Sequence, residues 1–141
     1  MSDAVTLGLQ IGPLLARAHH RAARAFAEAL VPIGIDGRIF GVLSTVDRLG
    51  PSTQARLSAE LGADKSNMLR TVDELERRGF VERRAVPGDR RARTIALTPA
   101  GQECLATAQT VAREVAGHLF GDMDPAQLTV LRDALKGFVL T

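Results

Sequence analysis

The 141-residue sequence has a single cysteine, Cys104, and neither tryptophan nor tyrosine. One thiol cannot form an intrachain disulfide or a multi-cysteine metal site. No apolar run approaches the ~18 residues that a membrane span needs, and no basic region followed by an apolar core stands at the N-terminus. We therefore expect a cytoplasmic protein with no membrane partner.

Motifs of catalysis and phosphate binding are also missing. The chain has no glycine-rich phosphate loop and no His-Glu-x-x-His pattern, and its three histidines are scattered over expected helices. His19 and His20 are adjacent and would point about 100° apart on a helix, so they do not form a paired set of metal ligands. We expect a protein that is not an enzyme and that holds neither a metal ion nor another cofactor.

The charge that is present is unevenly distributed. The formal net charge is only +2, yet the segment from Arg77 to Arg93 carries seven arginines against two acidic residues. Residues 99–141 carry three basic residues against five acidic ones. Positive charge is therefore concentrated in one segment, as contact with the DNA backbone requires. A solvated basic face is the alternative interpretation of such a run.

Apolar periodicity and capping residues predict four helices, a hairpin and two further helices. The expected helices cover about residues 5–31, 37–49, 54–61, 65–78, 99–120 and 125–139, and the expected N-caps are Asp36, Thr53, Asp64, Thr98 and Asp124. On the fourth helix the apolar spacing comprises Met68, Leu69, Val72 and Leu75. Strands over 80–86 and 92–97 flank a turn at Pro87-Gly88-Asp89.

The first, fifth and sixth helices carry more apolar surface than a small central module can cover. Pairing with a second copy of the chain would bury this surplus, which predicts a homodimer. The expected fold class is mainly α with a small β-hairpin. We assign residues 35–98 to a winged helix-turn-helix lobe and residues 1–34 and 99–141 to a helical dimerisation platform.

The order of motifs resembles the MarR family, the multiple-antibiotic-resistance type of bacterial transcription regulator. The resemblance covers nearly the whole chain and is carried by Leu57–Gly62, Lys65-Ser66, Arg70–Arg83, Asp89–Ala92 and Leu97–Gly101. It implies a homodimer that binds a double-stranded DNA operator. It also implies a small-molecule pocket between the platform and the DNA-binding lobes.

A helix that enters the major groove presents its N-terminal and outer residues to base edges. The hairpin over residues 80–97 corresponds to the wing of this family. With the wing included, the expected DNA contacts are Thr53, Lys65, Ser66, Asn67, Arg70, Thr71, Asp89, Arg90 and Arg91. Asn67 and Arg70 can make the bidentate contacts that distinguish adenine and guanine. A phosphate contact is the alternative for Arg70, and capping of the helix end is the alternative for Ser66 and Asn67.

The wing residues have separate expected roles, which the resemblance implies. Arg91 inserts into the minor groove, whose negative potential attracts a guanidinium. Arg90 contacts phosphate, and Asp89 braces the turn by pairing with an arginine.

The effector and its binding residues are the least defined part of this prediction. A small aromatic or anionic effector would meet Arg17, His20 and Arg24 on the first helix, although surface or dimer contacts are an alternative role for these residues. The resulting hypothesis is a repressor that the effector releases from its operator. One alternative is a redox-responsive regulator that acts through Cys104. The competing interpretation of Cys104 is a buried, inert thiol. Another is a non-catalytic helical protein-interaction module, which would leave the basic segment unexplained.

Overall fold

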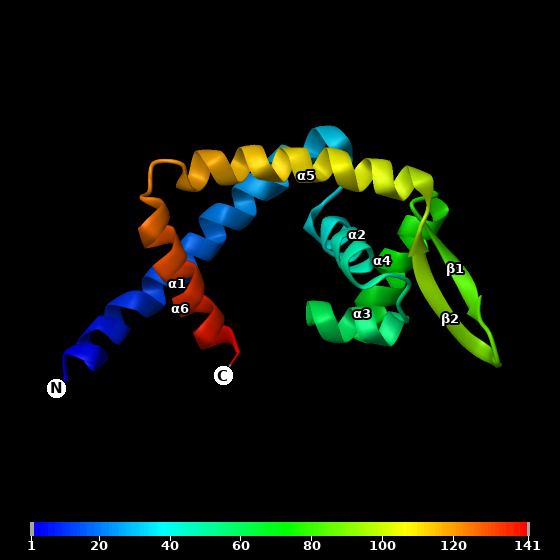
Figure 1. The fold of residues 1–141 in the computed structure, drawn as a ribbon, viewed down its shortest axis with the longest axis horizontal. Helices are drawn as coiled ribbons and strands as arrows, with labels where there is room; N and C mark the ends of the chain where they lie inside the picture. The colour runs from blue at the N-terminus through cyan, green and yellow to red at the C-terminus, as the bar shows by residue number, and fades with distance from the viewer. Residues whose placement is uncertain (1, 141) are drawn as a thin grey trace.

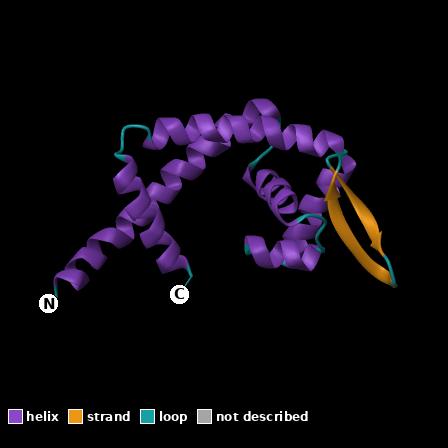
Figure 2. Ribbon diagram, viewed as in Figure 1, coloured by secondary structure: helices purple, strands orange, loops and turns teal. Residues whose placement is uncertain are grey.

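A computed structural model of the protein describes residues 2–140. The elements follow in the order α1 (Asp3–Leu30), a 3-10 turn (Val31–Ile33), α2 (Gly37–Leu49), α3 (Gln54–Leu61), α4 (Lys65–Arg77), β1 (Val81–Val86), β2 (Asp89–Leu97), α5 (Pro99–Phe120) and α6 (Pro125–Val139). In Figure 1, the helices α2, α3 and α4 and the hairpin form a lobe at one end of α5. At the opposite end of the molecule lie α6 and the start of α1. The predicted fold class, mainly α with one hairpin, is confirmed (Figure 2).

Short polar side chains begin the helices, because each accepts a hydrogen bond from a backbone N–H that the first helical turn leaves without a partner. The five predicted caps are confirmed, at Asp36, Thr53, Asp64, Thr98 and Asp124. The first helix begins earlier than predicted, at Asp3, where Ser2 is its cap. It continues through Pro13, which lies inside the range that the apolar periodicity predicts to be helical.

The core lies in the lobe and joins all of its elements. Its largest fully buried side chains include Ile39, Leu43, Leu57, Leu75 and Ile95. One residue of α1, Leu30, and two residues of α5, Leu105 and Ala108, belong to the same cluster. The end of α1 and the first half of α5 therefore pack onto the lobe, and the rest of both helices extends away from it (Figure 1).

The junction of α4, the hairpin and α5 is tightly packed at Gly101. A Cβ at this position would lie 1.9 Å from the carbonyl oxygen of Phe80, so no larger residue fits without movement of the backbone. The Thr98 hydroxyl donates to the carbonyl of Gly79, and the Thr98 N–H donates to that of Phe80. The residue that caps α5 is thus bonded to two of the residues that join α4 to β1.

The end of the molecule away from the lobe exposes apolar surface. None of the described residues of α6 is buried, and this helix packs extensively against no other described element. Its exposed residues include Val130 and Val139, which are 69% and 76% exposed. In the first half of α1, Leu7 and Leu14 are 55% and 59% exposed. One chain alone therefore leaves the apolar stripes of these helices uncovered.

Residues 2–140 contain no single helix that is long and apolar enough to cross a membrane. The segments Asp3–Ile33 and Gly37–Leu49 meet the criteria of length and composition only as a pair, and they are bent by 85° relative to each other. Within the same residues, no three His, Cys, Asp or Glu side chains gather as a set that could hold a metal ion.

Candidate nucleic-acid interface

The predicted recognition helix, α4, has a buried face and an outward, exposed face. Met68, Val72 and Leu75 are at most 2% exposed and hold the inner face of α4 in the core. Because successive residues rotate by about 100°, the residues between them turn outwards. Lys65, Ser66, Asn67 and Arg70, four of the residues predicted to contact DNA, are all exposed. Thr53 is also exposed, at the start of α3, where its hydroxyl oxygen accepts the N–H of Arg56 at 3.2 Å.

Asn67 and Arg70 form a connected network with the helix cap. Asp64 accepts both the backbone N–H of Asn67, at 2.8 Å, and its side-chain Nδ2, at 2.7 Å. The Oδ1 of Asn67 then accepts a hydrogen bond from the guanidinium of Arg70. The cap thereby sets the orientation of the amide, and the amide holds the guanidinium beside it. Since arginine has five N–H donors, Arg70 keeps donors for another partner.

Two residues of α4 differ from their predicted roles. Thr71 is only 3% exposed, and its hydroxyl donates to the Asn67 carbonyl at 3.0 Å and accepts from Arg38 Nη1 at 3.3 Å. We therefore revise Thr71 from a DNA contact to a buried residue that links α4 to α2. Leu69 differs in the opposite sense: the apolar spacing groups it with the core, but the residue is 44% exposed.

Arg38 connects the start of α2 to α4, a role that sequence reasoning missed. Its guanidinium lies 2.9 Å from the Asp36 carboxylate and 3.7 Å from that of Glu74. Partial burial raises the pKa of Asp36, but hydrogen bonds from the Ile39 N–H and from Arg38 outweigh this effect, and the pKa is lowered overall. The stabilisation by ionised Asp36 is therefore present above the ordinary aspartate pKa and is lost as the pH falls through the lowered value.

Arg83 fixes the base of the hairpin to the recognition helix. Its Nη2 lies 2.6 Å from Asp73 Oδ1 and its Nη1 lies 2.7 Å from Glu76 Oε1, and both carboxylates belong to α4. Partial burial lowers the pKa of Arg83, but the hydrogen bonds and charges of Asp73 and Glu76 outweigh it and raise the pKa overall. Arg83 therefore joins β1 to α4, and the charge that it contributes to the basic segment is already neutralised.

Other arginines of the basic segment also have partners within the chain. The Arg84 Nε lies 2.7 Å from Glu82 Oε1, and the Arg78 guanidinium lies 5.0 Å from the centre of the Phe80 ring, a cation–π distance. Arg90 and Arg91 are exposed, and among residues 2–140 their side chains have no hydrogen-bond or ion-pair partner. Among the same residues Arg77, in the last turn of α4, is also exposed without such a partner. The charge available to a polyanion thus lies at the far end of the hairpin and at the end of α4.

The hairpin differs from the prediction near its turn. The second strand begins at Asp89 instead of Ala92, so the turn comprises only Pro87 and Gly88. Pairing changes register between Ala85, which faces Arg93, and Val86, which faces Asp89. Residues 90–92 therefore form a bulge on β2. The residues of the turn do not reveal this bulge in the sequence. Arg91 lies in this bulge, next to the turn.

Asp89 braces the bulge, but not in the predicted way. Its Oδ1 accepts the backbone N–H groups of Arg91, at 3.0 Å, and Ala92, at 3.2 Å. Within residues 2–140 its carboxylate forms no ion pair, so the expected pairing of Asp89 with an arginine is wrong. The Arg93 guanidinium donates to the carbonyls of Arg90 and Ala92. These contacts hold the backbone of the bulge and leave the Arg91 side chain exposed.

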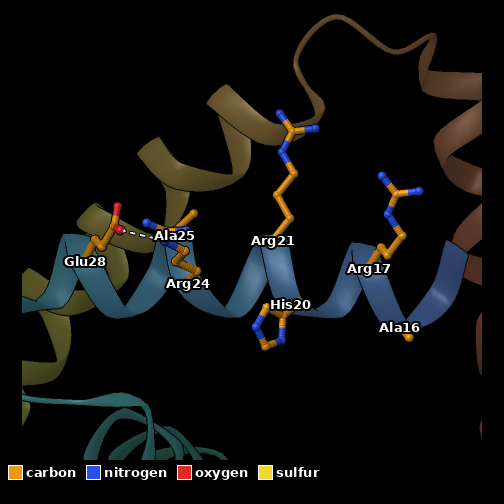
Figure 3. Close-up of a pocket in the computed structure, with 7 residues that line it drawn as sticks. All are labelled: Ala16, Arg17, His20, Arg21, Arg24, Ala25 and Glu28. Carbon is orange, nitrogen blue, oxygen red and sulfur yellow. Dashed lines mark hydrogen bonds and ion pairs between the residues drawn. The ribbon is translucent and has the colours of Figure 1, made fainter. Parts of the chain in front are cut away.

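The predicted effector residues lie close together in sequence on α1. Arg17, His20 and Arg24 line an open depression of about 580 Å³ to which only α1 contributes; the other lining residues are Ala16, Arg21, Ala25 and Glu28. Figure 3 shows the side chains of Arg17 and His20 pointing to different sides of the helix, while Arg24 pairs with Glu28 at 3.0 Å. A single chain thus places these residues near one another without enclosing a cavity.

Cys104 is half-buried and packs against the core at the start of α5. Burial raises the pKa of its thiol, and the charge of Arg78 lowers it by less, so the pKa is raised overall. Since the thiolate is the reactive form, this environment disfavours a redox sensor.

We expect Cys104→Ser to leave DNA affinity within about twofold of the wild type, and peroxide to change wild-type affinity equally little. Fluorescence anisotropy measures both, and a peroxide response that the serine variant abolishes would restore the redox hypothesis.

Comparison with known proteins identifies relatives of the chain. A sequence profile described as the MarR family matches residues 33–92. The chain is 40% identical over 74 residues to the transcriptional repressor MprA of Escherichia coli strain K12, a match that spans 51% of this chain. The matched segments span 42% to 59% of the first curated relatives, so the chain covers about half of their length.

Two solved structures match over nearly the whole chain. A MarR-family transcriptional regulator from Rhodococcus sp. RHA1 is 32% identical, with a TM-score of 0.83 and coverage of 94% of each chain. CouR from Rhodococcus jostii RHA1, solved bound to p-coumaroyl-CoA, is also 32% identical, with a TM-score of 0.82 and coverage of 91% of this chain and 90% of CouR. These relatives support the prediction of a regulator over an enzyme. In sequence and in fold, the chain belongs to the MarR family of transcriptional regulators.

Proposed function

We propose that the protein is a cytoplasmic, DNA-binding transcriptional repressor that binds a pseudo-palindromic operator as a homodimer and is released by a small aromatic or anionic effector. The observation that carries this proposal is the outer face of α4, where Asp64, Asn67 and Arg70 form one exposed network. Donors and acceptors held at defined positions on a recognition helix suit the base edges of the major groove.

The wing supports the same proposal. Arg83 holds β1 against α4, so the hairpin and the recognition helix have a fixed relative position. The free guanidinium groups of Arg90 and Arg91 lie at the far end of that hairpin. A helix in the major groove would then bring the arginines to the flanking backbone and minor groove.

The platform, residues 1–34 and 99–141, supports the homodimer. The exposed apolar stripes of α1 and α6 need a cover, and a second copy offers the same surface. The apolar stripe of α6 includes Leu128, Leu131 and Leu135. These residues help to line an apolar hollow of about 670 Å³. A two-fold pair would place its recognition helices about 34 Å apart, which requires a site of roughly 16–20 base pairs.

DNA binding is tested by selecting duplexes from a random pool and measuring gel shifts at several salt concentrations. We expect a palindromic consensus, with affinity that falls steeply as salt rises and with sequence preference retained at low salt. Recovery of no consensus, or equal affinity for selected and random duplexes, would contradict the proposal.

The repressor and effector assignments draw on the relatives. The name of MprA describes a transcriptional repressor, and CouR was solved with p-coumaroyl-CoA. An effector should weaken operator binding through a coupling of about 1–3 kcal/mol, and operator DNA should weaken effector binding by the same factor. A screen of phenolic and carboxylate metabolites, read by thermal shift and by DNA affinity, tests this step. A compound that binds but leaves operator affinity unchanged would not be the effector.

Arg91→Ala tests the wing. An inserted arginine senses groove width more than base identity, so we expect its loss to weaken binding most on operators with A·T-rich flanks. The salt slope should fall by about one phosphate equivalent or less. Anisotropy titrations on A·T-flanked and G·C-flanked duplexes measure both effects.

Arg84→Ala is the matched control for that experiment, because Arg84 lies on the same hairpin but is paired with Glu82. It should change affinity much less. Equal fractional losses of Arg91→Ala on the two kinds of flank would reduce Arg91 to a phosphate contact.

A further inference from the structure

The outward face of α4 carries one large apolar side chain, Leu69, which is 44% exposed. Its neighbours at helical spacing are Ser66, three residues before it, and Asp73, four residues after it, and both are exposed. Arg70 follows it directly. Leu69 therefore stands among the polar groups that the proposed function assigns to the major groove.

The rest of the chain does not explain this exposure. Leu69 is exposed in the presence of the hairpin and of every described helix, so it does not belong to the core of the lobe. The apolar stripes that we assign to dimerisation lie on α6 and the start of α1, at the opposite end of the molecule from α4 (Figure 1). A surface leucine is ordinary in itself; its position on the outer face of a recognition helix is what distinguishes it.

The charges beside Leu69 permit close approach to DNA. Asp73 alone would repel a phosphate, but its carboxylate lies 2.6 Å from the Arg83 guanidinium. On the other side, Arg70 and Lys65 are basic and exposed. Glu76 shares the Arg83 guanidinium with Asp73, so Arg83, Arg70 and Lys65 offset two carboxylates and the surface around Leu69 is positive overall. An apolar side chain can then reach the floor of the groove without an unpaired acidic group beside it.

We propose that Leu69 is a specificity-determining residue that packs against the C5 methyl group of a thymine in each half-site. The methyl group is the apolar feature that thymine alone presents in the major groove, and the other base edges offer donors and acceptors that leucine cannot satisfy. Burying the leucine against a polar edge would cost hydrogen bonds to water, whereas burying it against a methyl group does not. This inference rests on the proposed DNA-binding function and adds a base preference to it.

The test exchanges thymine for deoxyuridine, which removes only the methyl group. In a duplex selected by the wild-type protein, each thymine position is replaced in both half-sites, one position at a time, and affinity is measured by anisotropy. We expect one position at which wild-type affinity falls by about fourfold per half-site, the value of one buried methyl-sized group. In Leu69→Ala, the same replacement should change affinity by less than about twofold.

Leu61→Ala is the matched control, since Leu61 is a similarly exposed leucine, at 38%, on α3 of the same lobe. It should keep the wild-type response to deoxyuridine. The proposal is overturned if no thymine position matters to the wild type, or if the dependence persists in Leu69→Ala. These outcomes differ from failure of the proposed function, in which the wild type would select no duplex at all and both proposals would fall together.

Discussion

Arg70→Ala is expected to abolish most of the preference for a selected operator over random DNA. Arg70 is exposed on the outer face of α4, and the amide of Asn67 holds its guanidinium in place. A bidentate contact between arginine and guanine contributes about 1–3 kcal/mol of discrimination, and a dimer makes that contact in both half-sites. Competition titrations with selected and random duplexes measure the loss, which should fall almost entirely on the selected duplex.

Asn67→Ala complements Arg70→Ala, because it removes two things at once. One is the acceptor that orients Arg70, and the other is any contact that Asn67 itself makes with a base. We expect it to relax preference at the base pair that Asn67 reads and to weaken discrimination at the pair that Arg70 reads. Arg77→Ala, at an exposed position in the last turn of the same helix, is the control. If Arg70→Ala weakened selected and random duplexes equally, Arg70 would be a phosphate contact that carries no sequence information.

Leu131→Glu is expected to produce the largest loss, because it removes the dimer. Leu131 is 40% exposed and belongs to the apolar stripe of α6, and no other described element packs extensively against this helix. A charge there would have to be buried without a partner in the two-fold pair. We expect sedimentation to change from a dimer, at twice the 15.1 kDa of one chain, to a monomer. Operator affinity should fall by about 10²-fold or more, since two linked half-sites become independent.

Ala126→Glu is the control for this substitution, since it adds the same charge to the exposed first turn of α6, away from that stripe. Ala126→Glu should remain dimeric and bind DNA normally. A Leu131→Glu protein that stays dimeric would show that the interface lies elsewhere. A monomeric variant with unchanged operator affinity would separate dimerisation from DNA recognition and contradict the proposed mechanism.

The features that could be predicted from the sequence are those that short-range interactions determine. An N-cap such as Asp36 or Asp64 contacts an N–H three residues away, so its role is visible in a window of four residues. The same holds for the apolar periodicity of the helices and for Gly62, whose positive φ of 63° ends α3. The basic character of the hairpin was equally visible, and with the motif order it identified the family.

The misassigned residues are those whose environment comes from distant parts of the chain. Thr71 is buried and bonded by Arg38, which lies 33 residues earlier, so its removal from the DNA-facing surface has no local signal. Arg83 was counted as free positive charge because its partners, Asp73 and Glu76, belong to another element. Leu69 fits the apolar spacing of α4 as well as its neighbour Met68 does, and only the packing of the lobe separates a buried residue from an exposed one.

The stoichiometry of the complex with DNA tests the central claim most directly. Sedimentation of the wild-type protein with a selected duplex of about 20 base pairs, and with a duplex that keeps one half-site, compares the two modes of binding. A homodimer with paired recognition helices should give two chains on the full duplex and affinity for the half-site weaker by about 10²-fold or more. One chain on the full duplex, or equal affinity for the full site and the half-site, would contradict a homodimer that reads DNA through paired recognition helices.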